Sequence, residues 1–301
     1  FDTIGKNIHT AKSYMPLIWR DFDYTPGNAP SKTDVGSKKI LIVTDALNQQ
    51  RNLVRMIERF KSSFSTGIET INLCELDIKG SCLGCIQCGY DNQCVYEGKD
   101  DYIDFYNSKV KTADILVWAG TIKDRYLSAK WKTFFDRSFF NGHAPSLIGK
   151  QIGFIISGPL GQVPNLRQVL EAYVEIQHAN PVGFVTDEDG DSARIDALLQ
   201  TMGKRLVQFA HNDYIRPNTF LGVGGKILFR DEIWGRLRFP FRADYLALKK
   251  LGVYDFPQKK FKTRIQNAIM LFLSKLPAFR KEVNKKIKKE MIKPLQKTLD
   301  N

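Results

Sequence analysis

Short apolar runs alternate with amphipathic segments through most of the chain. The apolar runs are nearly continuous, which is typical of strands buried on both faces of a parallel sheet. Between the runs, apolar residues recur at helical spacing, as Leu53, Met56 and Phe60 do. The pattern predicts strands at residues 39–44, 67–74, 113–119, 152–157 and 182–186, and helices at residues 52–60, 101–111, 128–139, 165–178 and 191–209.

This alternation predicts an α/β fold, because parallel strands need crossover helices to connect them. Open sheets of this kind bind ligands beyond the carboxyl ends of their strands. Three loops are expected to converge at that edge, at residues 44–52, 120–128 and 157–162. A cysteine-rich loop follows the second predicted strand, so we expect it to lie at the same edge, beside the ligand crevice.

The segments on either side of the α/β pattern differ from it. Aromatic residues followed by the turn-rich string 25–31 predict an N-terminal arm that packs on the body or on a partner subunit and ends in a linker. The glycine-rich string 221–225 predicts a turn, with irregular structure after it. The chain thus divides into an arm with its linker, an α/β domain, an irregular extension and a basic helical tail, at residues 1–37, 38–215, 216–258 and 259–301.

Composition narrows the class of protein. The chain of 301 residues is 43% hydrophobic and 26% charged, as soluble globular proteins are. No apolar run approaches the roughly 18 residues that span a bilayer, so a transmembrane protein is not expected. The tail from residue 259 to 301 holds thirteen Lys and Arg against three acidic residues, which is +10 of the total formal charge of +13. The body is therefore nearly neutral, unlike a uniformly basic nucleic-acid-binding protein.

The basic tail has three interpretations. Its apolar residues recur at helical spacing, so its helices could pack on the body or on a partner subunit. Basic amphipathic helices also lie on anionic membranes. Nucleic-acid binding is the least favoured, because the aromatic interleaving of single-strand binders is poor here. We expect a cytoplasmic protein that could lie peripherally on the inner face of the membrane. The apolar positions are Phe261, Ile265, Ala268, Ile269, Phe272 and Leu273.

Four of the five cysteines fall within thirteen residues, with the spacing C-x2-C-x2-C-x5-C. Such a compact run favours a [4Fe–4S] cluster, as in ferredoxins, whereas zinc sites usually split into two distant pairs. Zinc and an unmetallated thiol-rich loop remain open alternatives. A disulfide framework is not favoured, because the fifth cysteine, Cys74, would be left over and is expected to be a buried strand thiol. The candidate metal ligands are Cys82, Cys85, Cys88 and Cys94.

Several motifs follow one another in a fixed order over about residues 38–210. After C-L-G-C at 82–85 and the two further cysteines come Asp100-Asp101, A-D-I-L-V at 113–117 and S-A-x-x-K-x-x-x-D-R at 128–137. In this order they resemble the iron–sulfur flavoproteins of the NADPH-dependent FMN reductase superfamily. The resemblance implies a flavodoxin-like fold with strand order 2-1-3-4-5, bound FMN and a [4Fe–4S] cluster on the four loop cysteines. It also implies a dimer or tetramer in which the cluster of one subunit lies near flavin.

The same resemblance implies FMN contacts in the three loops at the sheet edge. The first loop departs from the family's small-residue pattern, and Asp45 within it would repel phosphate. In the second loop, Lys123 or Arg125 would stabilise the anionic reduced flavin. The implied contacts are Asn48, Gln49, Arg51, Asn52, Thr121, Ile122, Lys123, Asp124, Arg125, Tyr126, Ser128, Ser157, Gly158, Pro159 and Gly161.

These features predict a flavin- and iron–sulfur-dependent oxidoreductase. It would pass electrons between a one-electron carrier such as ferredoxin, or NAD(P)H, and an acceptor. A clusterless NAD(P)H-dependent FMN or quinone reductase is one alternative, and a non-enzymatic flavodoxin-like interaction module is another. No catalytic residue is identified. The four histidines have no metal-ligand spacing and receive no role; they are His9, His143, His178 and His211.

Overall fold

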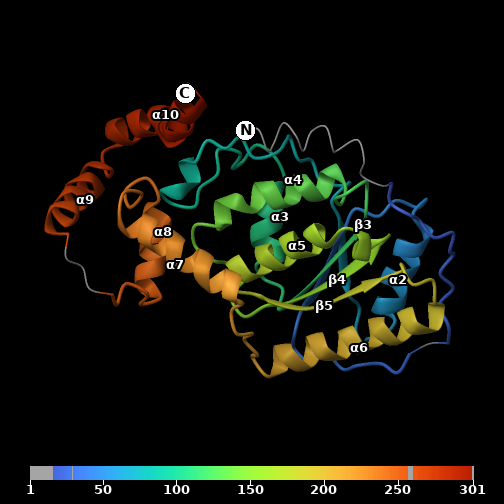
Figure 1. Ribbon diagram of the computed structural model, residues 1–301. Coiled ribbons are helices and arrows are strands. Elements are labelled where there is room, and N and C mark those ends of the chain that lie inside the picture. The colour runs from blue at the N-terminus through green and yellow to red at the C-terminus, as the bar shows by residue number, and fades with distance from the viewer. Residues whose placement is uncertain (1–15, 29, 257–259, 300–301) are drawn as a thin grey trace.

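The computed structural model describes residues 16–28, 30–256 and 260–299 of the chain. Five parallel strands form one sheet in the order β2-β1-β3-β4-β5 (Figure 1). This confirms the predicted α/β class and the strand order that the resemblance implied. The strands are β1 (Ile40–Thr44), β2 (Glu69–Asn72), β3 (Ile115–Thr121), β4 (Gln151–Ser157) and β5 (Asn180–Thr186).

Helices cover both faces of the sheet (Figure 1). On one face α2 and α6 bury residues such as Leu53 and Leu206 against Ile42. On the other face α3, α4 and α5 bury residues such as Phe134 and Leu170, because neighbouring strand residues point to opposite faces. The helices are α2 (Arg51–Lys61), α3 (Tyr102–Phe105, continued by a π-helical turn over Tyr106–Val110), α4 (Ala129–Arg137, continued by a 3-10 turn over Ser138–Asn141), α5 (Pro164–Ile176) and α6 (Ser192–His211).

The second predicted strand is shorter than expected. It ends at Asn72, so Cys74 lies beyond it in a turn. The prediction that Cys74 is a buried strand thiol was wrong, since its side chain is exposed. The reason is that β2 lies at the edge of the sheet and pairs with β1 alone. An apolar run in the sequence does not distinguish an edge strand from a central one.

The extension after the α/β domain is helical, not irregular. It contains α7 (Phe220–Trp234) and α8 (Arg242–Lys250), and the glycine-rich string that predicted a turn lies inside α7. Thr219 begins α7, since its side chain accepts the N–H of Gly222 at 3.0 Å and donates to Glu175 of α5 at 2.8 Å. A side chain at Gly222 would collide with Glu175. The glycine therefore lets α7 start against α5, a tertiary reason that the local sequence does not show.

The basic tail forms the two helices α9 (Phe261–Leu273) and α10 (Pro277–Leu299), as its periodicity predicts. Asn267 is buried on the inner side of α9 and donates to the carbonyl oxygen of Gly235 at 2.9 Å. Among the described residues, no helix is both long and apolar enough to cross a membrane. Residues 1–15 of the predicted arm, and positions 259, 300 and 301 of the predicted tail, lie outside the described residues.

Candidate functional site

The cysteine loop between β2 and α3 gathers its four cysteines around one small cavity. Gly84 and Ile86 have φ values of +60° and +61°, so the backbone turns sharply between the first three thiols. The Cys82 sulfur accepts the N–H of Gly84 at 3.4 Å, and all five cysteines of the chain are free. No three His, Cys, Asp or Glu side chains of the described residues are arranged to hold a metal ion. The structure thus brings the predicted ligands together without placing them in coordinating positions.

Arg137 at the end of α4 ties the two ends of this loop together. Its guanidinium donates to both Asp100 oxygens, at 2.6 and 2.9 Å, and to the carbonyl oxygen of Gly80 at 3.1 Å. Both charged side chains are fully buried, and the guanidinium lies 3.9 Å from the ring centroid of Tyr96. Burial would raise the pKa of Asp100, but the hydrogen bond from Arg137 lowers it below the ordinary value. This ion pair fixes where the cysteine loop leaves and rejoins the core.

Cys88 lies in a buried polar chain that the sequence analysis missed. His143 Nε2 is 3.2 Å from the Cys88 sulfur, and His143 Nδ1 is 2.8 Å from an oxygen of Asp244 in α8. All three side chains are buried, and burial raises the pKa of the Cys88 thiol to about 12. A free thiol in this environment is neutral, so the arrangement does not make an activated cysteine nucleophile. The sequence assigns His143 no role because the histidines show no metal-ligand spacing. Its partners lie 55 and 101 residues away in the chain, so no local pattern indicates this contact.

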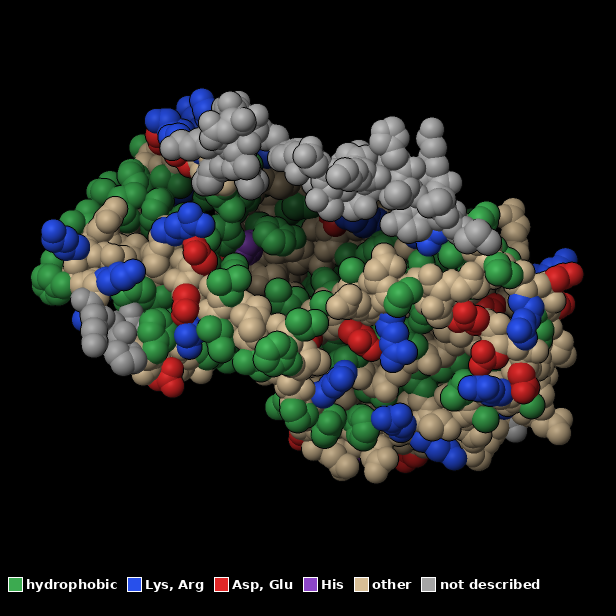
Figure 2. Space-filling model, in the orientation of Figure 1, with side chains coloured by type: hydrophobic (Ala, Val, Ile, Leu, Met, Phe, Trp, Pro, Cys, Tyr) green, Lys and Arg blue, Asp and Glu red, His purple; other side chains and the backbone are tan. Residues whose placement is uncertain are grey.

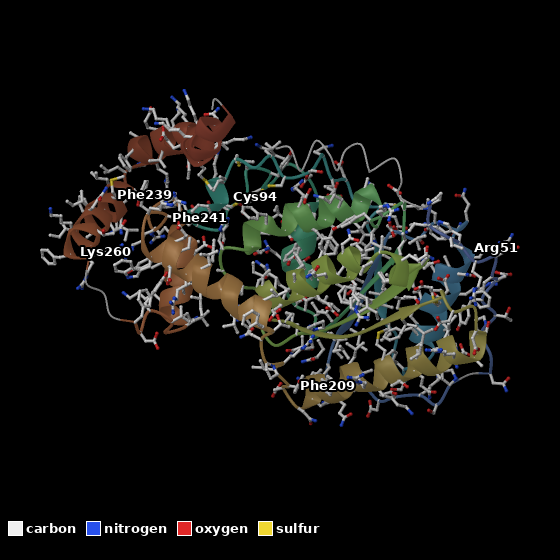
Figure 3. All side chains as sticks on the ribbon, in the orientation of Figure 1. Arg51, Cys94, Phe209, Phe239, Phe241 and Lys260 are labelled. Carbon is white, nitrogen blue, oxygen red and sulfur yellow. The ribbon has the colours of Figure 1, made fainter. Side chains whose placement is uncertain are left out.

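The cysteine centre does not lie beside the crevice at the sheet edge, contrary to the sequence-based expectation. Ser128 at the carboxyl edge caps α4, whereas Arg137 and Phe140 at the other end of this helix line the cysteine cavity. Nine helical residues span roughly 13 Å. Figure 3 accordingly shows the two labelled residues far apart, with Cys94 beside the extension and Arg51 at the far edge of the α/β domain. The reason is that the long loop after β2 runs back along α4 instead of staying at the edge.

The three predicted flavin loops do meet at the carboxyl edge. The N–H of Ile122 donates to the carbonyl oxygen of Ser157 at 2.9 Å and joins the second loop to the third. Lys123 and Tyr126 close the second loop with two backbone hydrogen bonds, of 2.6 and 3.2 Å. The hydroxyl of Thr121 is buried and has no hydrogen-bond partner among the described residues. An unsatisfied buried hydroxyl at this edge is suited to a polar ligand atom.

Two carboxylates already accept hydrogen bonds from the hydroxyl and backbone N–H donors of the third loop. Ser157 Oγ and the N–H of Gly158 each donate to Asp187 at 2.7 Å, and the N–H of Gly161 donates to Glu188 at 2.7 Å. Both acids follow β5. A ligand that uses these donors must therefore displace the two carboxylates.

The first loop is only partly arranged for phosphate. Asn48, Gln49 and Arg51 are exposed, whereas Asp45 is buried and accepts the indole N–H of Trp131 at 3.1 Å. Burial raises the pKa of Asp45. The acid thus lies in the first loop against Trp131. The repulsion of phosphate that the sequence leads us to expect stays a prediction.

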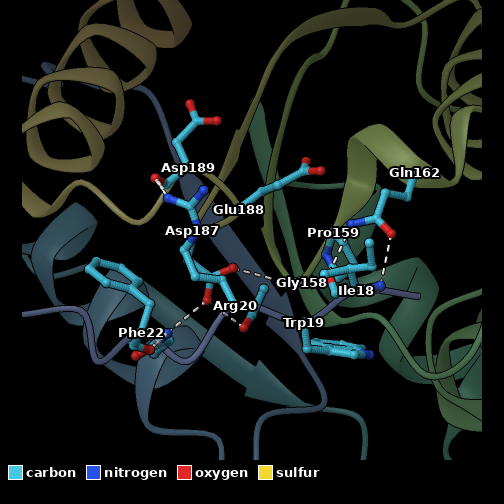
Figure 4. A pocket seen from close by; sticks show the side chains of 12 residues that line it. Ile18, Trp19, Arg20, Phe22, Gly158, Pro159, Gln162, Asp187, Glu188 and Asp189 are labelled. Carbon is cyan, nitrogen blue, oxygen red and sulfur yellow. Dashed lines mark hydrogen bonds between the residues drawn. The ribbon is translucent and has the colours of Figure 1, made fainter. Parts of the chain in front are cut away.

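The described part of the N-terminal arm packs on the body, which is one of the two alternatives expected from the sequence, and it crosses the flavin loops. Asn52, an implied phosphate contact, donates to the carbonyl oxygen of Phe22 and accepts the N–H of Tyr24, both at 2.8 Å. Trp19 lies against Gly158, where a side chain would come within 2.9 Å of the indole. Figure 4 shows the resulting cavity, of about 380 Å³, between the arm and the residues after β4 and β5. The arm was predicted, but its place over this crevice has no signal in the local sequence.

Comparison with known proteins supports the resemblance. The chain matches no family model. It is 31% identical over 180 residues to the curated iron-sulfur flavoprotein of Archaeoglobus fulgidus, covering 57% of this chain and 78% of that protein.

Solved structures show distant likeness in fold. RosB with bound 8-demethyl-8-formylriboflavin-5'-phosphate is 12% identical with a TM-score of 0.47, covering 65% of this chain and 88% of that one. The NAD(P)H:quinone oxidoreductase from Methanothermobacter marburgensis is 13% identical with a TM-score of 0.44, covering 57% and 98%. Similarities this low carry no argument about activity. The sequence relative is 31% identical and is matched over 78% of its length, and this chain therefore belongs to the iron–sulfur flavoprotein family.

Proposed function

We propose that this flavin-dependent oxidoreductase exchanges electrons between a [4Fe–4S] cluster on its cysteine loop and FMN at its three edge loops. The observation that carries the proposal is the gathering of Cys82, Cys85, Cys88 and Cys94 around one cavity whose loop is clasped by Arg137. The cluster would supply one-electron chemistry, and FMN would supply two-electron chemistry. A one-electron carrier such as ferredoxin, or NAD(P)H, would be the donor.

The donor set fits a cluster. Four free thiols face one cavity, a backbone N–H already donates to the Cys82 sulfur, and Arg137 places a positive charge beside Cys94. Such N–H···S bonds and nearby charge stabilise thiolate ligands. Because no three sulfurs are yet in coordinating positions, the loop must tighten when a cluster binds. The clasp at its two ends leaves the intervening turns free to do so.

The edge loops fit FMN in part. The Thr121 hydroxyl, which has no partner among the described residues, favours a polar ligand atom there, whereas Trp19 already lies against Gly158, where a planar ring would approach. Lys123 and Arg125 supply positive charge for the reduced flavin, while Asn48, Gln49 and Arg51 remain exposed for phosphate. Asp187 and Glu188 compete for the loop donors. This competition predicts weak FMN binding.

The distance between the two centres supports an oligomer. Within one chain the two centres lie at opposite ends of α4. Direct electron transfer between them is therefore slower than it would be between centres in contact. A dimer or tetramer that sets the cysteine loop of one subunit against the edge loops of another would shorten the path. This proposal is checked in the same experiment as the cofactors, by the mass of the loaded protein.

The deciding experiment is anaerobic purification followed by an absorption spectrum and analysis of iron, acid-labile sulfide and flavin. We expect resolved flavin bands on a broad cluster absorbance. Flavin without iron would support the clusterless NAD(P)H-dependent reductase instead. A colourless protein would contradict the proposal and favour a flavodoxin-like interaction module.

We also propose that the tail attaches this cytoplasmic protein reversibly to anionic lipid. Helix α9 turns its apolar face outward: Phe261 is 70% and Phe272 is 67% exposed, while the polar Asn267 is buried. A second copy of the chain is a poor occupant of this face, since it would bring two tails of net charge +10 together. Anionic lipid complements both the apolar face and the charge.

Vesicle sedimentation tests the attachment. The full chain should bind vesicles that contain anionic phosphatidylserine at low salt and release them at high salt, and should not bind zwitterionic vesicles. Changing Phe261→Ser together with Phe272→Ser should abolish binding, because the buried apolar area is lost. The matched control changes Val169→Ser and Leu198→Ser, two exposed apolar residues on α5 and α6 of the α/β domain, and should bind normally. Binding that survives the first pair of substitutions would rule the α9 face out.

A further inference from the structure

A large cavity, here called the apolar chamber, separates the core from the extension. Its volume is about 820 Å³, within the range of small-molecule pockets. Figure 2 looks into a hollow between these two parts, and hydrophobic side chains cover much of what is visible there. Phe135 and Ile176 line the chamber from α4 and α5, and Ile227 and Leu248 line it from α7 and α8. A space enclosed from two sides suits a small molecule better than a flat protein surface.

The chamber also touches the cysteine centre. Cys82 lines it directly, and so do His143 and Asp244, the pair that reaches the Cys88 sulfur. Both ring nitrogens of His143 already have partners within the protein, the Cys88 sulfur and the Asp244 carboxylate. This pair therefore offers a molecule in the chamber a packing surface and not a hydrogen bond. A molecule in the chamber would lie against a proposed cluster ligand.

The charged groups in the wall do not call for a charged occupant. Lys226 donates to Asn218 at 2.5 Å, and Arg230 donates to Asp231 at 2.9 Å. The Glu175 carboxylate also lies close enough to Lys226 to offset part of its positive charge. The rest of the lining is mostly apolar.

We propose that the apolar chamber binds an uncharged ring compound of the quinone class, which accepts electrons from the cysteine centre. This rests on the proposed function, because the reduced cluster is the electron source. The cluster would pass two electrons to the quinone in succession, being reduced again between them by the proposed donor or by FMN. With two protons from solvent the quinone would become the hydroquinone. Met291 of α10 lines the same chamber, so the site adjoins the helices proposed to contact lipid, where apolar quinones dissolve.

Two neighbouring residues of α8 provide a matched test. Ala247 lines the chamber, whereas Leu246 is 44% exposed to solvent. Ala247→Trp should fill part of the chamber, and Leu246→Trp should add the same ring outside it. The first readout is equilibrium binding of menadione to the oxidised holoprotein. The second is the anaerobic rate at which menadione, or the small hydrophilic oxidant ferricyanide, reoxidises the reduced holoprotein.

We expect Ala247→Trp to weaken menadione binding by about tenfold or more, the scale of a steric cost of 1.4 kcal/mol. Reoxidation by menadione should slow in step, while reoxidation by ferricyanide is unchanged. Leu246→Trp should match the wild-type protein in every assay. Ile227→Trp, on α7 in the same extension wall, should repeat the loss if Ala247→Trp does not fold.

The outcomes separate the two proposals. Menadione binding that is unaffected by Ala247→Trp and Ile227→Trp in folded protein would overturn the chamber as the quinone site. A wild-type protein that binds menadione but holds no reducible iron would instead overturn the proposed electron source, while the chamber would stand as a binding site.

Discussion

Replacing Cys85 with serine is expected to remove most of the cluster iron while the protein still folds. A hydroxyl is a poor ligand for iron compared with a thiolate, and three remaining cysteines leave one iron without protein ligation. The sheet and its helices are held by two hydrophobic clusters to which Cys85 contributes nothing. Cys88→Ser should have the same effect on iron with a larger cost in stability, because Cys88 is buried in the core.

Anaerobic iron and sulfide analysis, with circular dichroism as the check on folding, measures this loss. Cys74→Ser is the matched control. Cys74 is exposed and precedes Gly80, so it lies outside the part of the loop that Arg137 clasps. Its sulfur is 3.8 Å from the carbonyl oxygen of Asp45, and its loss should leave the iron content unchanged. If Cys85→Ser retained full iron and sulfide, the ligand assignment would be wrong. If Cys74→Ser lost iron as well, the effect would not be specific to the loop.

The layered core was predictable because its signal is local. Each central strand is a continuous apolar run, and each covering helix repeats its apolar residues every three or four positions. The Ser128 and Asp191 caps also lie where the sequence places the helix starts. The four cysteines were predictable as a group, since their spacing alone limits them to one loop.

The surroundings of the cysteine centre were not predictable, because they depend on distant parts of the chain. His143 reaches Cys88 only after α4 has ended, and Asp244 reaches His143 only because α8 packs on the loop. The position of α8 in turn depends on α7. The glycines of α7 predict a turn when only the local sequence is considered, whereas in the fold Gly222 is needed because Glu175 packs beside it. No local pattern predicts that the arm covers Gly158, or that Asp187 accepts a hydrogen bond from the N–H of Gly158. Sequence periodicity specifies which faces are buried but not which partner buries them.

Replacing Arg137 with alanine should be among the most destabilising substitutions in the chain. It removes a fully buried guanidinium and leaves the buried Asp100 carboxylate without its partner, a change that typically costs about 3–5 kcal/mol in the free energy of unfolding. It also releases the carbonyl oxygen of Gly80, so both ends of the cysteine loop lose their anchor. Arg137→Lys should recover only part of the loss, since an ammonium cannot donate to both Asp100 oxygens in the same plane.

Denaturant unfolding gives the stability, and iron retention during anaerobic gel filtration reports on the loop. Arg59→Ala is the matched control, because Arg59 forms a part-buried ion pair with Asp196 at 2.9 Å, away from the cysteines. Both substitutions should lower stability, but only Arg137→Ala should also release iron. Equal iron retention in the two variants would show that the Arg137 clasp does not hold the cysteine loop in place.

The pH dependence of the clasp has a definite sign. The pKa of Asp100 is lower in the folded protein than its ordinary value of about 3.9. Its stabilising contribution is therefore complete above that ordinary value and is lost as the pH falls through the lower folded pKa. In Arg137→Ala the burial of Asp100 is no longer offset by Arg137, so its carboxylate takes up a proton at a higher pH than in the wild-type protein. The difference in unfolding free energy between the two proteins should therefore be largest near neutral pH and should shrink as the pH falls towards the lowered pKa of Asp100 in the wild-type protein. A difference that stayed constant to pH 2, in protein that still unfolds cooperatively, would mean that the Asp100 carboxylate does not supply the energy of the clasp.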